Sequence, residues 1–179
     1  MWKWFNFTFL AVITSLWISG CNQPAVEEEA SFSQTLLDPG SSAAIRGSQP
    51  GDTPDKVRKR ETLELSKNTD SLLVYVGQLD FNERPVDITL LYSFDEFGLY
   101  EFQFDLYPAS KSDASNLFGE FRNFLTTLYG VPKKDGLSLR FTSFSPSNNT
   151  VEVTLTDETS QAETPFVTLI FLETLDDEI

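Results

Sequence analysis

Apolar and polar residues alternate over two neighbouring stretches of this chain, and no other sequence feature constrains the fold as strongly. Every second residue is apolar between residues 86 and 94, and the same period returns between residues 99 and 107. A period of two places alternate side chains on one face of a β-strand. The turn Asp95-Glu96-Phe97-Gly98 separates the stretches, and Gly98 can adopt the left-handed conformation that such a turn needs. We therefore expect an antiparallel hairpin whose inner face carries Val86, Ile88, Leu90, Tyr92 and Phe94 on one strand and Tyr100, Phe102, Phe104 and Leu106 on the other.

Other segments have the patterns of helices and further strands. A short helix is expected from Thr53 to Leu63, because Thr53 and Pro54 are typical of the first helical positions. A longer helix is expected over residues 113–129, where apolar residues recur at helical spacing before Gly130. The remaining expected strands cover residues 71–79, 137–144, 150–156 and 166–173. The last of these is apolar on both faces, which is typical of a central strand.

The order of these elements predicts an α+β fold. The chain runs as one helix, three strands, a second helix and three more strands. We expect two α-β-β-β units, at about 45–108 and 109–179, that together form an antiparallel sheet of about six strands with the helices on one face. Both units then belong to one domain over residues 45–179.

The composition excludes several classes of protein. The chain has 179 residues, no histidine and one cysteine, with 27 acidic residues against 13 basic ones. These counts exclude histidine-based triads, an internal disulfide and the commonest metal sites. The net charge of −14 argues against a nucleic-acid partner, because a polyanion binds to clustered cations. The sequence has no phosphate-binding loop and no nucleophile elbow. We expect no metal, no cofactor and no catalysis, and a hydrolase that uses paired carboxylates is the third-ranked hypothesis.

The first 21 residues have the pattern of a targeting signal. Residues 5–17 form an apolar run with the length of a signal-peptide core, shorter than a membrane span. The next segment, Ile18-Ser19-Gly20-Cys21, resembles the lipobox of bacterial lipoproteins. The resemblance implies a signal peptide over residues 1–20, cleavage between Gly20 and Cys21, and a membrane anchor through lipid on Cys21. An uncleaved anchor helix with an incidental cysteine is the alternative.

The lipobox resemblance also bears on location and on the segment that follows. In lipoproteins of bacteria with two membranes, a residue such as Asn22 after the cysteine favours the outer membrane, so we expect a protein that faces the periplasm. Residues 21–44 are expected to be a flexible tether, because they contain few large apolar residues. The alternative is that residues 32–37 or 43–46 pack along the edge of the domain.

One helix carries a cluster of basic residues in an otherwise acidic chain. Lys56, Arg58, Lys59 and Arg60 follow one another closely in the expected first helix. Such a cluster is a candidate contact for anionic lipid headgroups or for an acidic partner. The alternative is a solvated helix face without a partner.

Two helix boundaries resemble those of small bacterial envelope domains. The segment Gly51-Asp52-Thr53-Pro54-Asp55-Lys56-Val57 is similar to the helix entry of the SmpA/OmlA outer-membrane assembly lipoproteins and of β-lactamase inhibitor proteins. The segment Phe124-Leu125-Thr126-Thr127-Leu128-Tyr129-Gly130-Val131-Pro132 looks like a helix exit of the same kind of protein. These families are noncatalytic, so the resemblance implies contact with another protein through an open sheet face or through loops.

The expected sheet leaves one face available for binding. Tyr75, Leu91, Leu99, Tyr107 and Phe144 are expected on that face or near strand ends, and Tyr75, Leu91 and Tyr107 are the candidate contact residues among them. The alternative is that the tether or the first helix covers the face. Our leading hypothesis is a lipid-anchored, noncatalytic envelope protein that binds another protein in envelope assembly or maintenance. The second hypothesis is a lipoprotein that binds a small apolar or peptidoglycan-derived ligand.

Overall fold

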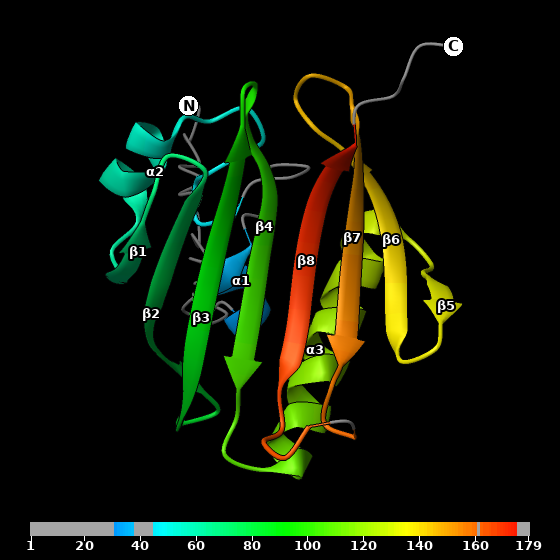
Figure 1. Ribbon diagram of the computed structural model, residues 1–179. Coiled ribbons are helices and arrows are strands. Elements are labelled where there is room, and N and C mark those ends of the chain that lie inside the picture. The colour runs from blue at the N-terminus through cyan, green and yellow to red at the C-terminus, as the bar shows by residue number, and fades with distance from the viewer. Residues whose placement is uncertain (1–30, 38–44, 161, 175–179) are drawn as a thin grey trace, which may run out of the picture.

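The protein forms one antiparallel β-sheet with helices on one of its faces (Figure 1). The computed structural model describes residues 31–37, 45–160 and 162–174. Over these residues the sheet has eight strands in the order β1-β2-β3-β4-β8-β7-β6-β5. The strands are β1 (Glu64–Asn68), β2 (Leu72–Phe81), β3 (Arg84–Asp95), β4 (Gly98–Tyr107), β5 (Lys133–Asp135), β6 (Ser138–Phe144), β7 (Thr150–Asp157) and β8 (Val167–Thr174). The helices are α1 (Phe32–Leu36), α2 (Pro54–Arg60) and α3 (Lys111–Tyr129).

This architecture corrects the expected fold of two α-β-β-β units with about six strands. The observed sheet is a single one, in which two four-stranded meanders, β1–β4 and β5–β8, join where β4 pairs with β8. The two strands that were not expected, β1 and β5, lie at the sheet edges, and all their residues are exposed. A strand that buries neither face has no reason to alternate apolar and polar residues, so its sequence lacks the pattern.

The six expected strands are confirmed, and their buried apolar residues lie on one face. One row of this covered face runs across five strands through Leu73, Tyr92, Phe102, Phe171 and Val153, which are paired in register. Each of these side chains is buried, and the rings of Tyr92, Phe102 and Phe171 meet edge to face. Strand β8 lies between β4 and β7, so the prediction that it is central is confirmed.

The hairpin of β3 and β4 forms as expected except at its turn. A bulge shifts the register after Ser93, so that Phe94 pairs with Leu99 rather than with Tyr100. Leu99 is therefore buried, whereas Tyr100, which was expected inside, is only half-buried. Gly98 has a φ of 115°, and a Cβ at this position would lie 2.7 Å from the carbonyl carbon of Gly51. The turn thus needs glycine both for its backbone conformation and for this close approach.

Helices α1 and α3 cover the apolar face of the sheet (Figure 1). Leu117, Phe121 and Leu125 of α3 are buried against β6, β7 and β8, and α1 packs beside α3. Gly130, with a φ of 84°, follows α3 as predicted. No helix in the described part of the chain is long and apolar enough to cross a membrane.

The position of α1 corrects part of the tether prediction. Phe32, Leu36 and Leu37 were expected in a flexible segment, yet they are buried in the core. The ring of Phe32 meets the rings of Phe81 and Phe121 edge to face. Residues 31–37 therefore belong to the folded body, which corresponds to the alternative that residues 32–37 pack on the domain. The rest of the expected tether up to residue 44 lies outside the described residues.

Candidate functional site

No described element covers the sheet face opposite α1 and α3 (Figure 1). We call it the open face and define it by two rows of side chains in register on β2, β3, β4, β8 and β7: Val74, Leu91, Gln103, Ile170 and Thr154 in one row, and Val76, Thr89, Asp105, Thr168 and Thr156 in the other. All are half-buried except Thr168, which is buried. The apolar members lie on β2, β3 and β8, and polar members lie between and beside them.

A fixed carboxylate lies near the middle of the open face. Asp105 accepts hydrogen bonds from Gln103 Nε2 at 2.9 Å and from Thr168 Oγ1 at 3.0 Å. Glu101 and Glu152 are also half-buried on this side of the sheet, in the register row beside that of Leu91. The face therefore combines apolar side chains with several carboxylates. This pattern suits a partner surface that carries apolar residues together with lysine or arginine.

Two of the three predicted contact residues lie on this side of the sheet. Leu91 is in the open face. Tyr107 lies at the end of β4, where the centroid of its ring is 5.6 Å from that of Phe166. Burial raises the pKa of Tyr107 above its ordinary value, and the charge of Asp105 adds to this effect. Both side chains are half-buried and available for contact.

The prediction of the third contact residue, Tyr75, is wrong. It lies on the covered face, where only 3% of it is exposed and its ring meets that of Tyr92. Its register partner is Leu90 of the core. An apolar run such as Leu72–Val76 does not by itself show which alternate residues point inward, because both sets are apolar. Tyr75 is therefore part of the core and cannot contact a partner.

Most of the cations of the basic helix α2 form ion pairs with nearby carboxylates. Asp52, which is 2% exposed, accepts hydrogen bonds from Lys56 Nζ at 3.2 Å and Arg60 Nη1 at 2.5 Å. Arg58 Nη1 lies 2.6 Å from Asp55 Oδ1. Of the four predicted contact residues, only Lys59 has no ion pair with a described residue. Lys56 and Arg60 are thus paired with Asp52, and Arg58 is paired with Asp55 of its own helix and also donates to Asn68 of β1. These pairings weaken the helix as a contact for anionic lipid.

A second group of buried charges joins Arg46, in the segment before α2, to the sheet. Arg46 binds both carboxylate oxygens of Glu61 at 2.9 Å, and the hydroxyl of Tyr92 donates to Glu61 Oε2 at 3.0 Å. Burial acts to raise the pKa of Glu61, but hydrogen bonds from Arg46 and from the amides of Leu63 and Thr62 hold it below its ordinary value. Burial also raises the pKa of Tyr92, and the negative charge of Glu61 adds to the increase. The group is charged and saturated with partners, so it stabilises the fold.

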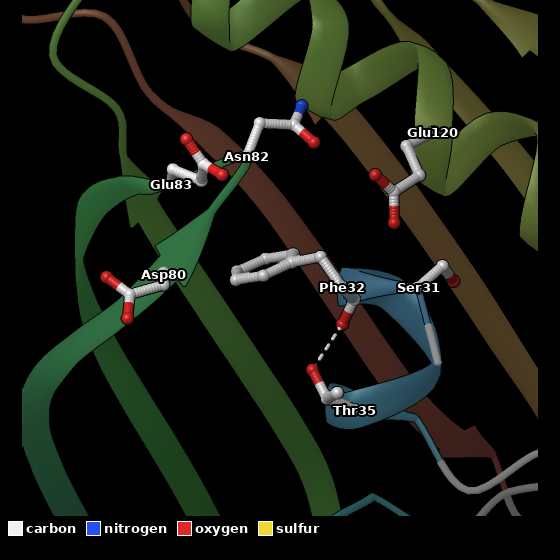
Figure 2. A pocket seen from close by; sticks show the side chains of 7 residues that line it. All are labelled: Ser31, Phe32, Thr35, Asp80, Asn82, Glu83 and Glu120. Atoms are coloured by element: carbon white, nitrogen blue, oxygen red, sulfur yellow. Dashed lines mark hydrogen bonds between the residues drawn. The ribbon is translucent and has the colours of Figure 1, made fainter. Parts of the chain in front are cut away.

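A hollow lies on the helix side of the sheet, where α1 meets α3 and the turn between β2 and β3. Figure 2 shows the seven residues that line its volume of about 610 Å³: Ser31, Phe32, Thr35, Asp80, Asn82, Glu83 and Glu120. Glu120 Oε1 accepts a hydrogen bond from the amide of Ser33 at 2.8 Å and so holds α1 in place. Among the described residues, no group of three or more His, Cys, Asp or Glu is placed to hold a metal ion.

A smaller hollow of about 360 Å³ lies between α3 and the strands β5 and β6. Phe118, Leu137 and Leu139 supply its apolar lining, and Arg122, Lys134 and Asp157 its charges. None of the residues that line this hollow is among the site residues predicted from the sequence. The adjacent cations Lys133 and Lys134 beside Val131 are the sequence signal that could have indicated it.

The lipidation residues Gly20 and Cys21 lie outside the described residues, so the lipid anchor stays a prediction. No protein-family model matches this chain, and no curated protein and no solved structure is significantly similar to it. The proposed role therefore depends on the lipobox resemblance and on the open face.

Proposed function

We propose that this protein is a lipid-anchored, noncatalytic component of a bacterial cell envelope that binds another protein through the open face. The observation that carries the binding role is an uncovered surface across five strands on which half-buried Leu91, Val74 and Ile170 lie beside the fixed carboxylate of Asp105. Apolar residues near the centre of a patch and charged residues around them are typical of protein interfaces. The expected partner presents apolar side chains flanked by lysine or arginine.

The anchor is supported by the position of Cys21. It is the single cysteine of the chain, and it follows an apolar run of signal-peptide length at the place where the lipobox pattern needs it. Lipid on Cys21 holds the body near the bilayer, because more than one acyl chain gives stable membrane binding. By the resemblance of Asn22 to sorting signals, we place the body at the outer membrane facing the periplasm.

Metabolic labelling with an alkyne-tagged palmitate tests the anchor. Cells of a bacterium with two membranes that express the full chain should incorporate the label, and the Cys21→Ser variant should not. Globomycin, which blocks the lipoprotein signal peptidase, should shift the labelled chain to a larger mass. A chain that stays unlabelled while a known lipoprotein in the same cells is labelled contradicts the anchor.

Site-specific photo-crosslinking tests the binding face. A photoreactive amino acid at Leu91 should give a discrete covalent adduct with a second protein in living cells. The matched position is Asn116, an exposed residue of α3 on the other side of the molecule. We expect adducts at Leu91 and none at Asn116. Adducts at Asn116 alone would contradict the open face as the binding surface.

The second hypothesis, a small apolar or peptidoglycan-derived ligand, has less support. The hollow of about 610 Å³ is large enough for such a ligand, but Asp80, Glu83 and Glu120 line it together with one buried aromatic ring, that of Phe32. Ligand pockets are mostly apolar with few polar groups. A protein partner on the open face therefore fits the structure better.

A further inference from the structure

One arginine of the described chain, Arg122, has no ion pair within it, whereas all the others do. Arg46, Arg58, Arg60, Arg84 and Arg140 each form an ion pair with a carboxylate. Arg122 forms none with any described residue, and the only hydrogen bond of its guanidinium to a described residue is a 3.5 Å contact with Asn123 Oδ1. In a chain with about two acids for every base, a cation that is left unpaired is available for an anion from outside.

Two lysines near Arg122 also lack an ion pair within the described chain. Lys134 lines the same hollow of about 360 Å³, and neither Lys134 nor the adjacent Lys133 has an ion pair with a described residue. Asp157 is the one carboxylate in the lining. The other nearby carboxylate, Asp135, is engaged by Arg140 at 2.9 Å. The hollow and its margin are thus a local cationic site in an acidic protein.

Apolar side chains beside these cations are exposed to water. Val131 is 92% exposed and Leu137 is 42% exposed, and Leu137 lines the hollow together with the half-buried Phe118. Val131 lies between α3 and β5, and Lys133 and Lys134 lie in β5, which forms one edge of the sheet in Figure 1. Exposed apolar residues next to lysine and arginine are typical of surfaces that enter the interface of a bilayer.

We propose that the hollow of Arg122 and Lys134 binds an anionic lipid headgroup of the bilayer, with Val131 and Leu137 inserted at the interface. The guanidinium of Arg122 can donate two parallel hydrogen bonds to a phosphate, and Lys133 and Lys134 add charge. The inference rests on the proposed lipid anchor for its setting. Ser31 begins the described body ten residues after Cys21, a length of chain that reaches at most about 35 Å.

This assignment replaces the headgroup contact expected at α2. Three of the four cations of α2 are paired with Asp52 or Asp55, whereas Arg122, Lys133 and Lys134 have no ion pair with a described residue. The hollow lies on the helix side of the sheet, beside α3. A body that rests on the membrane through this site keeps its open face accessible to a partner.

Lysine reactivity in nanodiscs tests the proposal. The full chain is reconstituted in discs of phosphatidylcholine alone or of phosphatidylcholine with phosphatidylglycerol, and acetylation of each lysine is followed by mass spectrometry. We expect Lys133 and Lys134 to react at least fivefold more slowly in the anionic discs, and Lys67 on β1 to react equally in both. Equal rates for Lys134 in the two discs, or slowing at Lys56 and Lys59 instead, would overturn the proposal.

Two matched variants locate the effect. Arg122→Gln removes the unpaired cation and should reduce the phosphatidylglycerol-dependent slowing at Lys134 to less than twofold, whereas Arg58→Gln should leave it unchanged. If millimolar inorganic phosphate protects Lys134 equally well in phosphatidylcholine discs, the site holds any anion and the lipid proposal is wrong. The full chain enters discs through lipid on Cys21 or through its apolar residues 5–17. The nanodisc result can therefore be interpreted even if palmitate labelling fails, because labelling tests only the proposed anchor.

Discussion

Two tyrosines of the covered face have opposite hydrogen-bonding states. The hydroxyl of Tyr92 donates to the carboxylate of Glu61 at 3.0 Å, whereas the buried hydroxyl of Tyr75 has no hydrogen-bond partner among the described residues. Their rings touch, with centroids 5.9 Å apart. A hydrogen bond to a charged group contributes to stability, while a buried polar atom without a partner costs free energy of desolvation.

Replacement of each tyrosine by phenylalanine should therefore change stability in opposite directions. We expect Tyr92→Phe to lower the free energy of unfolding by about 1.5 to 3 kcal/mol, because Glu61 loses a donor. Tyr75→Phe should raise it by about 1 kcal/mol or leave it unchanged, because only an unsatisfied hydroxyl is removed. Urea unfolding followed by circular dichroism measures both values. A loss of more than about 1 kcal/mol in Tyr75→Phe would show that its hydroxyl has a partner.

At the scale of elements, α1 shows how a short segment can become part of the core. It has five residues, and Ser31 and Gln34 form a capping box at its start. A helix of this length does not form alone in water, so its stability comes from packing. Phe32 and Leu36 provide this packing against the covered face, and the amide of Ser33 donates to Glu120 of α3.

Truncation of one ring should measure how firmly α1 is held. Phe32→Ala should reduce the free energy of unfolding by about 3 kcal/mol, the usual cost of a buried phenylalanine. Phe97→Ala removes the same atoms from a side chain that is 66% exposed, and it should cost less than about 1 kcal/mol. Both are read from chemical denaturation of the full chain in detergent. Equal losses in the two variants would mean that α1 is not docked in solution.

Elements with an amphipathic pattern could be predicted from the sequence, and those without it could not. The hairpin of β3 and β4 and the long helix α3 were predicted because one face of each is buried and apolar. β1, with the sequence Glu64–Asn68, and the three residues of β5 bury neither face. Phe32 and Leu36 were assigned to a tether because the polar residues around them outweigh two apolar ones in composition. Their burial depends on partners such as Phe121, which are distant in sequence.

The candidate contact residues could likewise be assigned to a face only where their strand has an alternating pattern. Leu91 and Tyr107 lie on the open side of the sheet because they fall between core positions of strongly alternating strands, and their contact with a partner stays a prediction. Tyr75 was misplaced because its strand is apolar on both sides. The neutralisation of the α2 cations by Asp52 could not be foreseen, since it depends on how the loop before the helix folds back.

At the scale of the whole molecule, the two sides of the sheet have different roles. The covered face holds the core, α1 and α3, and the hollow of Arg122 and Lys134 lies on this side. The open face has no described element against it and carries the apolar and acidic residues of the proposed interface. The two proposed contacts, with a bilayer and with a protein partner, therefore lie on opposite sides of the sheet.

The binding affinity of matched leucine variants tests the central claim most directly. Leu91 lies in the open face, whereas Leu65 of β1 is 39% exposed and pairs with Tyr75, on the other side of the sheet. Each is replaced by threonine, which suits a strand, and binding to the partner captured at position 91 is measured by surface plasmon resonance. We predict that Leu91→Thr weakens binding at least about tenfold, as expected for a central interface residue, and that Leu65→Thr leaves it unchanged. Equal affinity of Leu91→Thr and the unaltered protein would contradict the open face as the binding surface.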